Sequence, residues 1–179
     1  FIVPTMGSHG GATAAGQIEM LETLGITEET MGVPIKSSME VVKIGEIMNG
    51  RPVYLDKYAN DADGIILINR IKAHTSFRGT YESGLMKMMA IGLGKQIGAE
   101  HYHKTGFKHF PEIIEKVGPE VLKKKNICFG VGIIDNSYGK VSEIALLNAD
   151  EIVEKEKELL KKANKLMPRF FFDQADVLI

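Results

Sequence analysis

The sequence contains no tryptophan, a single cysteine and no excess of charge of one sign. The 22 basic and 23 acidic side chains give a formal net charge of −1, which excludes a protein that binds nucleic acid or a membrane surface mainly through its charge. No apolar stretch approaches the roughly 20 residues needed to cross a bilayer, and the chain does not open on a basic segment followed by an apolar run. These absences predict a cytoplasmic protein.

Composition and length predict one globular unit. Hydrophobic residues make up 44% and charged residues 25% of the 179, which is ordinary globular usage and leaves enough apolar side chain for a core. Cys128 cannot form an internal disulfide, and its place in the apolar run 127–131 predicts a small buried side chain. The chain opens on the strand-like FIVP and ends on the apolar DVLI. We therefore interpret residues 1–179 as a partial domain, truncated at both ends, of a longer polypeptide.

Short aliphatic runs alternate along the chain with stretches whose apolar residues recur at helical spacing. The runs predict strands at 1–3, 40–44, 52–55, 64–68, 127–134, 142–147 and 176–179. The other stretches predict helices at 14–24, 85–97, 111–125 and 149–167. This alternation is typical of an α/β fold, a layered sheet with flanking helices. The Asn-Ser-Tyr-Gly turn at 136–139 indicates a hairpin, so we expect a mixed sheet.

A glycine-rich segment, Pro4–Thr13, connects the first predicted strand to the first predicted helix. Its glycines allow unusual backbone angles and close approach of a ligand, and the helix start that follows offers free N–H groups to an anion. His9, in the middle of this segment, is therefore predicted to be presented rather than packed. The alternative is an ordinary glycine-rich turn with an exposed histidine. The spacing is neither a dinucleotide-binding fingerprint nor a Walker loop.

A second polar segment, residues 69–87, also lies between a predicted strand and a predicted helix. It carries His74, whose imidazole is suited to exchanging a proton with a substrate hydroxyl near neutral pH. Arg70 and Arg78 are candidates for a carboxylate clamp, with surface placement as the alternative. For His74 the alternative is a loop histidine that is hydrogen-bonded to the backbone.

Lys87 stands out because it lies in the apolar run Leu85–Ala90. An unpaired ammonium is costly to bury in such surroundings. The lysine is therefore predicted either to reach the rim of the protein with its stem packed, or to have a reactive partner.

A third group, His101 and His103, follows the predicted helix at 85–97. Histidines two residues apart point the same way on a strand but to nearly opposite sides of a helix, so this pair alone is a weak metal signal. No G-x-S-x-G motif is present, and Cys128 is placed in a strand, so a serine or cysteine nucleophile is poorly supported.

With these residues assembled, the sequence resembles the lactate racemase family, the nickel-pincer-dependent racemases and epimerases of 2-hydroxy acids. The motifs that carry the resemblance are PTMGSHGGAT and NRIKAHTSFRGTYESGLMKMMAIGLGK. The resemblance covers nearly the whole chain and implies part of the N-terminal domain of a two-domain protein, whose C-terminal domain completes the cleft. The site that it implies consists of His9 and His74 as acid/base pair, Lys87 as attachment point of the pyridinium thioamide nucleotide, with Ser83 and Gly84 leading into it, and His101 or His103 as nickel ligand.

The implied cofactor makes chemical sense of Lys87, because acylation as a thioamide removes the charge that its apolar neighbours disfavour. A square-planar Ni(II) held by soft sulfur and a pincer carbon needs only one imidazole more. Removal of hydride from C2 of a small 2-hydroxy acid gives a planar keto acid, and two histidines on opposite sides suit its return from either face.

Two other functions remain open from the sequence. One is a hydro-lyase or epimerase on the same scaffold that uses the histidines without the pincer nucleotide. The other is a module without catalytic activity that binds an anionic metabolite or nucleotide at the glycine-rich helix start.

Overall fold

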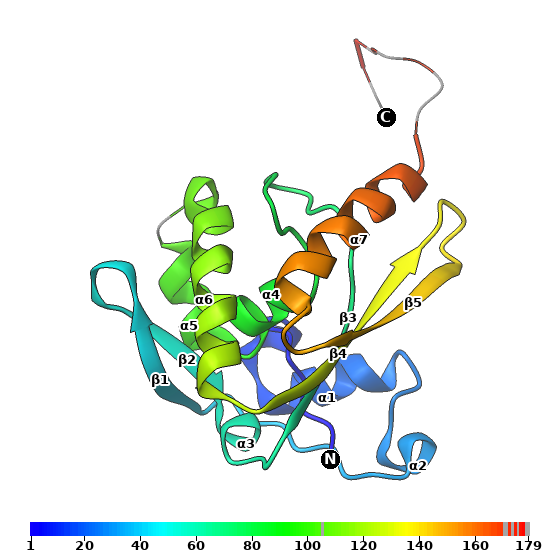
Figure 1. The fold of residues 1–179 in the computed structure, drawn as a ribbon. Helices are drawn as coiled ribbons and strands as arrows, with labels where there is room; N and C mark the ends of the chain where they lie inside the picture. Colours follow the sequence, from blue (N-terminus) through cyan, green and yellow to red (C-terminus); the bar gives the residue numbers. More distant parts are fainter. Residues whose placement is uncertain (105, 170–171, 173, 175, 178–179) are drawn as a thin grey trace.

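A computed structural model describes residues 1–104, 106–169, 172, 174 and 176–177 (Figure 1). In this part, β1 (Val41–Ile47) and β2 (Arg51–Asp56) form one sheet, and β3 (Ile65–Arg70), β4 (Ile127–Asp135) and β5 (Val141–Asn148) form another. The α-helices are α1 (Ala14–Glu22), α2 (Glu28–Met31), α3 (Lys57–Asn60), α4 (Leu85–Lys87), α5 (Lys95–His103), α6 (Phe110–Lys124) and α7 (Ile152–Leu166). A π-helical turn, η3 (Met88–Gly92), follows α4, and 3₁₀ turns occupy Gly10–Ala12, Met48–Gly50 and Phe107–His109.

The three-stranded sheet is mixed, as the sequence predicts. Strands β3 and β4 are parallel, and β4 and β5 form an antiparallel hairpin whose turn is the Asn-Ser-Tyr-Gly segment. The other sheet is an antiparallel hairpin of β1 and β2, with a bulge between Lys43 and Gly45. These observations confirm a layered α/β fold.

Helices cover one face of the three-stranded sheet. In Figure 1, α7 runs along this face and α4 lies beside it. Gly130 of β4 permits the close approach, because a Cβ there would lie 2.5 Å from Leu85 Cδ1 and 3.3 Å from Ile152 Cδ1. Helix α6 packs against both α4 and β1 and so joins the two sheets. On the opposite face of the sheet, aliphatic side chains are more than half exposed, among them Ile66, Ile68, Ile144 and Leu146.

The predicted helix at 85–97 is wrong in one respect, since it is interrupted. It divides into α4, η3 and, after a turn at Leu93 and Gly94, α5. At the break Lys95 has a positive φ of 52°. The N-terminal segment packs closely on η3 just before it, since a Cβ on Gly92 would lie 2.4 Å from the Thr5 carbonyl oxygen. The helix that follows extends to His103, so both histidines of the third group are helical.

Cys128 is exposed, which corrects the prediction of a buried thiol. Ile65 pairs with Ile127, whereas Ile66 pairs with Phe129, so Cys128 is the extra residue of a bulge and points outward.

The strands predicted at the two ends of the chain are not observed as strands in the described residues. The predicted strand at 1–3 is reduced to one bridge between Ile2 and Ile35. The predicted strand at 176–179 falls partly outside the described residues, and Asp176 and Val177 are not in a strand. Among the described helices, none has both the length and the apolar character needed to span a bilayer.

Candidate functional site

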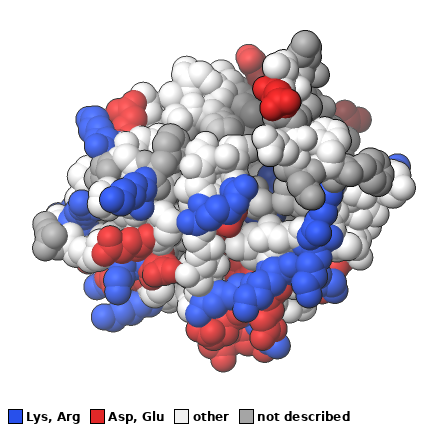
Figure 2. All heavy atoms as spheres, turned by 90° about the horizontal axis from the view of Figure 1, so that it is seen from above, with Lys and Arg blue, Asp and Glu red and all other residues white. Residues whose placement is uncertain are grey.

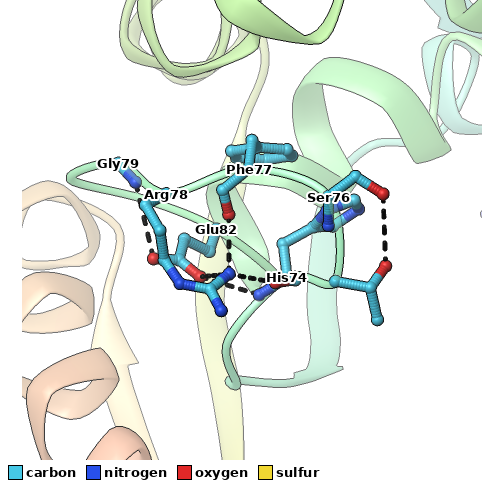
Figure 3. A network of polar contacts seen from close by, with 7 residues as sticks. His74, Ser76, Phe77, Arg78, Gly79 and Glu82 are labelled. Carbon is cyan, nitrogen blue, oxygen red and sulfur yellow. Dashed lines mark hydrogen bonds and ion pairs between the residues drawn. The ribbon is translucent and has the colours of Figure 1, made fainter. Parts of the chain in front are cut away.

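Glu82 organises the loop that carries His74 (Figure 3). Its carboxylate is buried and accepts hydrogen bonds from the backbone N–H groups of His74 at 2.7 Å and Gly79 at 3.4 Å. It also pairs with the Arg78 guanidinium at 3.6 Å. Arg78 in turn donates to the carbonyl oxygens of His74 and Phe77. The backbone on both sides of His74 is therefore fixed by charged side chains.

The His74 ring is held by its own loop. Its Nδ1 accepts a hydrogen bond from the Ser76 backbone N–H at 3.0 Å, so the neutral ring carries its hydrogen on Nε2. One face of the ring stacks on Phe77, with 4.2 Å between the ring centroids. The imidazole of His74 is thus held in one orientation. The same hydrogen bonds to the backbone are also expected of a loop histidine without a catalytic role.

Helix α4 presents Lys87, and α7 holds the start of that helix in place. Glu156 of α7 is buried, and its carboxylate accepts the Met86 backbone N–H at 3.0 Å. Gly84 leaves the space for it, since a Cβ on Gly84 would lie 2.4 Å from Glu156 Oε1. A second tie comes from Tyr81, whose hydroxyl donates to the Val153 carbonyl oxygen at 2.7 Å. The segment 81–87 is therefore fixed from both sides of its Ser-Gly pair.

Lys87 is partly buried, and burial followed by the nearby charge of Lys72 lowers the pKa of its amine. No salt bridge in the described part of the chain involves Lys87. A desolvated amine beside a second cation has more of its neutral, nucleophilic form. Lys87 is thus a partly buried amine with no ion-pair partner among the described residues.

The structure brings His74, Lys87 and His103 together; we call these three residues the His–Lys cluster. Burial and then the nearby Lys87 ammonium lower the pKa of both His74 and His103. A row of aromatic rings connects the two histidines: Phe77 packs on Phe110 at 5.6 Å between centroids, and Phe110 stacks on His103 at 5.0 Å. Both imidazoles therefore favour their neutral form next to the lysine.

His101 points elsewhere. Its ring packs edge-on against Tyr54, with 6.4 Å between centroids, and against Tyr102 at 5.6 Å. Two residues apart on α5, His101 and His103 lie on different sides of the helix, as helical geometry requires. Only His103 of this pair joins the His–Lys cluster.

His9 is exposed on a separate turn. The turn lies against the helical segment that follows Lys87, because the Gly7 N–H donates to the Gly92 carbonyl oxygen at 3.3 Å. Among the described residues, the His9 ring makes no ring contact and no salt bridge with the His–Lys cluster. Thr13 caps the helix that follows by accepting the Gly16 N–H at 3.0 Å, as the sequence predicts.

The two arginines are occupied by protein partners. Arg70 pairs through Nε with Asp135 at 2.9 Å, and the contacts of Arg78 to Glu82 are described above. Both guanidinium groups are largely exposed, so a carboxylate could reach them only in competition with these partners. Figure 2 shows basic and acidic side chains side by side over the face that it views.

Two buried charged side chains, Glu156 and Lys95, are not among the candidates that the sequence suggests. Glu156 follows Ile152 by four residues and so lies on the apolar face of the predicted last helix. A carboxylate on the apolar face of a helix predicts a buried charge. Lys95 interrupts the apolar run after Met88, and the structure buries it completely. Both are charged residues among apolar neighbours in the sequence, which is the pattern that singled out Lys87.

The donor set decides whether the cluster can hold a metal. In the described residues no group of three or more His, Cys, Asp or Glu side chains could hold a metal ion. The cluster instead offers two imidazoles beside a lysine amine, and His103 is the one that is available as a ligand if His74 serves in proton transfer. These residues fit a metal that a lysine-linked organic group already binds through soft donors, since such a centre needs one imidazole more.

A comparison with known families identifies the family of the chain. Residues 1–115 match the family described as the lactate racemase N-terminal domain, and this range contains His9, His74, Lys87 and His103. A search of curated proteins finds no significant match. Because the matched range covers more than half of the chain, the protein belongs to the lactate racemase N-terminal domain family.

Proposed function

We propose that this chain carries the acid/base and attachment residues of a racemase or epimerase of a small 2-hydroxy acid. Lys87 is the attachment point of a nickel pincer nucleotide, His103 is the protein ligand of the metal, and His74 and His9 are the acid/base pair. The observation that carries the proposal is that two imidazoles lie near a partly buried lysine that has no carboxylate partner among the described residues. Family membership supports the same class of reaction.

The bound nucleotide would supply a hydride acceptor for C2 of the substrate. The chain's own residues would handle the proton of the substrate hydroxyl. In the present arrangement Nε2 of neutral His74 carries a hydrogen, and Nδ1 accepts the Ser76 N–H. Proton uptake on His74 therefore requires this turn to release Nδ1, which couples the acid/base step to the conformation of the loop.

Charge on Lys87 also matters for this step. The amine lowers the pKa of His74 after burial, so conversion of the amine into an uncharged thioamide removes one of the two main obstacles to protonation. Attachment thus makes His74 a better base. The same change removes the cost of a cation near the apolar residues around Lys87.

The second half of the cleft would come from other parts of the same polypeptide. His9 and the His–Lys cluster lie on different segments, and a 2-hydroxy acid bound between them needs groups that grip its carboxylate. We propose that the C-terminal domain that the resemblance implies supplies them. The substrate is a small molecule, with no nucleic acid or membrane partner.

The test uses the full-length protein from cells that make the cofactor. Intact-mass and peptide mass spectrometry should find an adduct on Lys87, metal analysis should find nickel, and chiral chromatography should show interconversion of the two hands of one acid in a panel. Lys87→Ala should abolish all three. Lys140→Ala, a change of an exposed lysine in the β4–β5 turn, is the matched control and should leave them intact.

Two outcomes contradict the proposal. An unmodified Lys87 in fully active protein would exclude the pincer mechanism and favour the pincer-independent enzyme. Binding of anionic metabolites without isomerisation or exchange of the C2 hydrogen of any acid would favour the binding module.

A further inference from the structure

Lys95, the first residue of α5, is fully buried, and its side chain reaches three other segments. Its ammonium donates to the Pro4 carbonyl oxygen and, at 3.0 Å, to Gln17 Oε1. It also pairs at 3.3 Å with Asp56 Oδ2, and both of these side chains are 0% exposed. Two N–H donors of the ammonium have hydrogen-bond acceptors, and Asp56 contributes a charge close by rather than a hydrogen bond, since Asp56 Oδ2 has no hydrogen-bond partner among the described residues. The lysine is therefore held by tertiary contacts from three segments.

The ammonium determines which way the Gln17 side-chain amide faces. Lysine donates and never accepts, so the amide must turn its oxygen towards Lys95. Its NH₂ group then faces the N-terminal turn, where it donates to the carbonyl oxygens of Gly7 at 2.9 Å and His9 at 3.2 Å. With the amide reversed, its oxygen would face two carbonyl oxygens and its NH₂ group would face a cation. Lys95 thus excludes the reversed orientation.

The turn that carries His9 depends on such external contacts. Four of its residues have positive φ: Gly7 at 60°, Gly10 at 66°, Gly11 at 63° and Ala12 at 55°. A non-glycine residue is disfavoured in this region, and glycines have many alternative conformations. Hydrogen bonds within the turn, from the His9 N–H to the Met6 carbonyl oxygen and from the Ala12 N–H to the Ser8 carbonyl oxygen, both at 3.1 Å, shape it locally. The contacts from Gln17 and Gly92 add the ties that hold it against the rest of the protein.

We propose that Lys95 is a positioning residue, which holds the turn carrying His9 in one conformation through the side-chain amide of Gln17. Asp56 supports it by balancing the buried charge. The functional consequence rests on the proposed catalytic role of His9. The conformational part rests on the contacts alone, and Lys95 itself touches no substrate.

Two variants separate this role from general packing. Gln17→Glu keeps two oxygens that accept from Lys95 but loses the donor to the Gly7 and His9 carbonyls. Lys95→Met combined with Asp56→Asn removes the ammonium without leaving a buried carboxylate unpaired. The control is Lys162→Met, which breaks the solvent-exposed pair of Lys162 with Glu143.

Amide hydrogen exchange and the NMR signals of the His9 ring are measured on the full chain. In both variants, exchange at residues 7–12 should become at least about tenfold faster while β4 is unchanged, because only the local contacts are lost. The His9 ring should then give more than one set of signals. The control should match the wild type. Unchanged exchange at residues 7–12 in both variants, or a uniform increase over the whole chain, would overturn the positioning role.

Turnover of the cofactor-loaded protein connects the turn to catalysis. We expect kcat for interconversion to fall by about tenfold or more with KM within about twofold, because a misplaced acid/base group slows the reaction more than it weakens binding. Unchanged kcat with a loosened turn would overturn the link to catalysis. If the wild type interconverts no 2-hydroxy acid, the proposed function fails, and the exchange data still decide the role of Lys95.

Discussion

Glu156 should make the protein less stable as the pH rises through neutrality. The carboxyl group is 1% exposed, and burial raises its pKa from 4.5 to about 7, against the opposing effect of hydrogen bonds from the backbone of Met86 and Leu85. The folded state therefore holds this proton more tightly than the unfolded state. Between pH 4.5 and about 7 the folded protein binds more protons, so its free energy of unfolding falls as the pH rises.

The size of the effect follows from the shift. A raised pKa of about 7 against 4.5 corresponds to about 3 kcal/mol, which is lost across this pH window and levels off above it. Glu156→Gln keeps an oxygen for the Met86 N–H but has no charge at any pH. The variant should therefore lack this part of the pH dependence. Glu154→Gln, which changes an exposed carboxylate on the same helix, is the control and should retain it.

The assay is urea unfolding followed by circular dichroism at pH 5.0 and 7.5, at constant ionic strength. All other ionisable groups are shared, so the difference between wild type and Glu156→Gln isolates this carboxyl group. The reasoning is refuted if that difference changes by less than about 1 kcal/mol between the two pH values. It is also refuted if the wild type gains stability relative to the variant at the higher pH, because Glu156 would then be ionised in the folded state and stabilised by the N-terminus of α4.

Three further perturbations probe the same region. Gly92→Ala places a Cβ 2.4 Å from the Thr5 carbonyl oxygen and should lower the free energy of unfolding in urea by about 1–3 kcal/mol. The control Gly98→Ala, whose Cβ would lie 3.7 Å from its nearest atom, should be neutral or stabilising. Equal effects of the two substitutions would contradict the close approach at Gly92. Lys87→Met should raise the pKa of His74 in an NMR titration, because a nearby positive charge is removed, and an unchanged or lower pKa would show that the two groups do not interact. Glu82→Ala should cost about 1–3 kcal/mol in thermal or urea unfolding, since it leaves the partly buried His74 N–H without its acceptor, and a loss below about 0.5 kcal/mol would mean that water replaces the carboxylate.

The sequence by itself determined the fold class, the strands β1–β5 and the helices α1, α6 and α7, whereas the short helices α2 and α3 were not predicted. Periodicity predicted β2, β5 and α7 nearly to their ends, since amphipathic patterns are local properties of the chain. The turn at 136–139 fixed the antiparallel hairpin for the same reason. Lys87 was singled out because it is a charged residue in an apolar run of the sequence. The same criterion applied to Glu156, which lies among the apolar positions of the last helix, would have predicted its burial.

Tertiary structure decided what local patterns cannot encode. The bulge that exposes Cys128 depends on pairing with β3, and the close packing of the N-terminal segment on Gly92 joins residues far apart in the chain. The assembly of His74 with His103, to the exclusion of His101, depends on how far α5 extends and which side of it faces α6. Such contacts join residues far apart in the chain, so their energies are set by packing rather than by neighbouring residues.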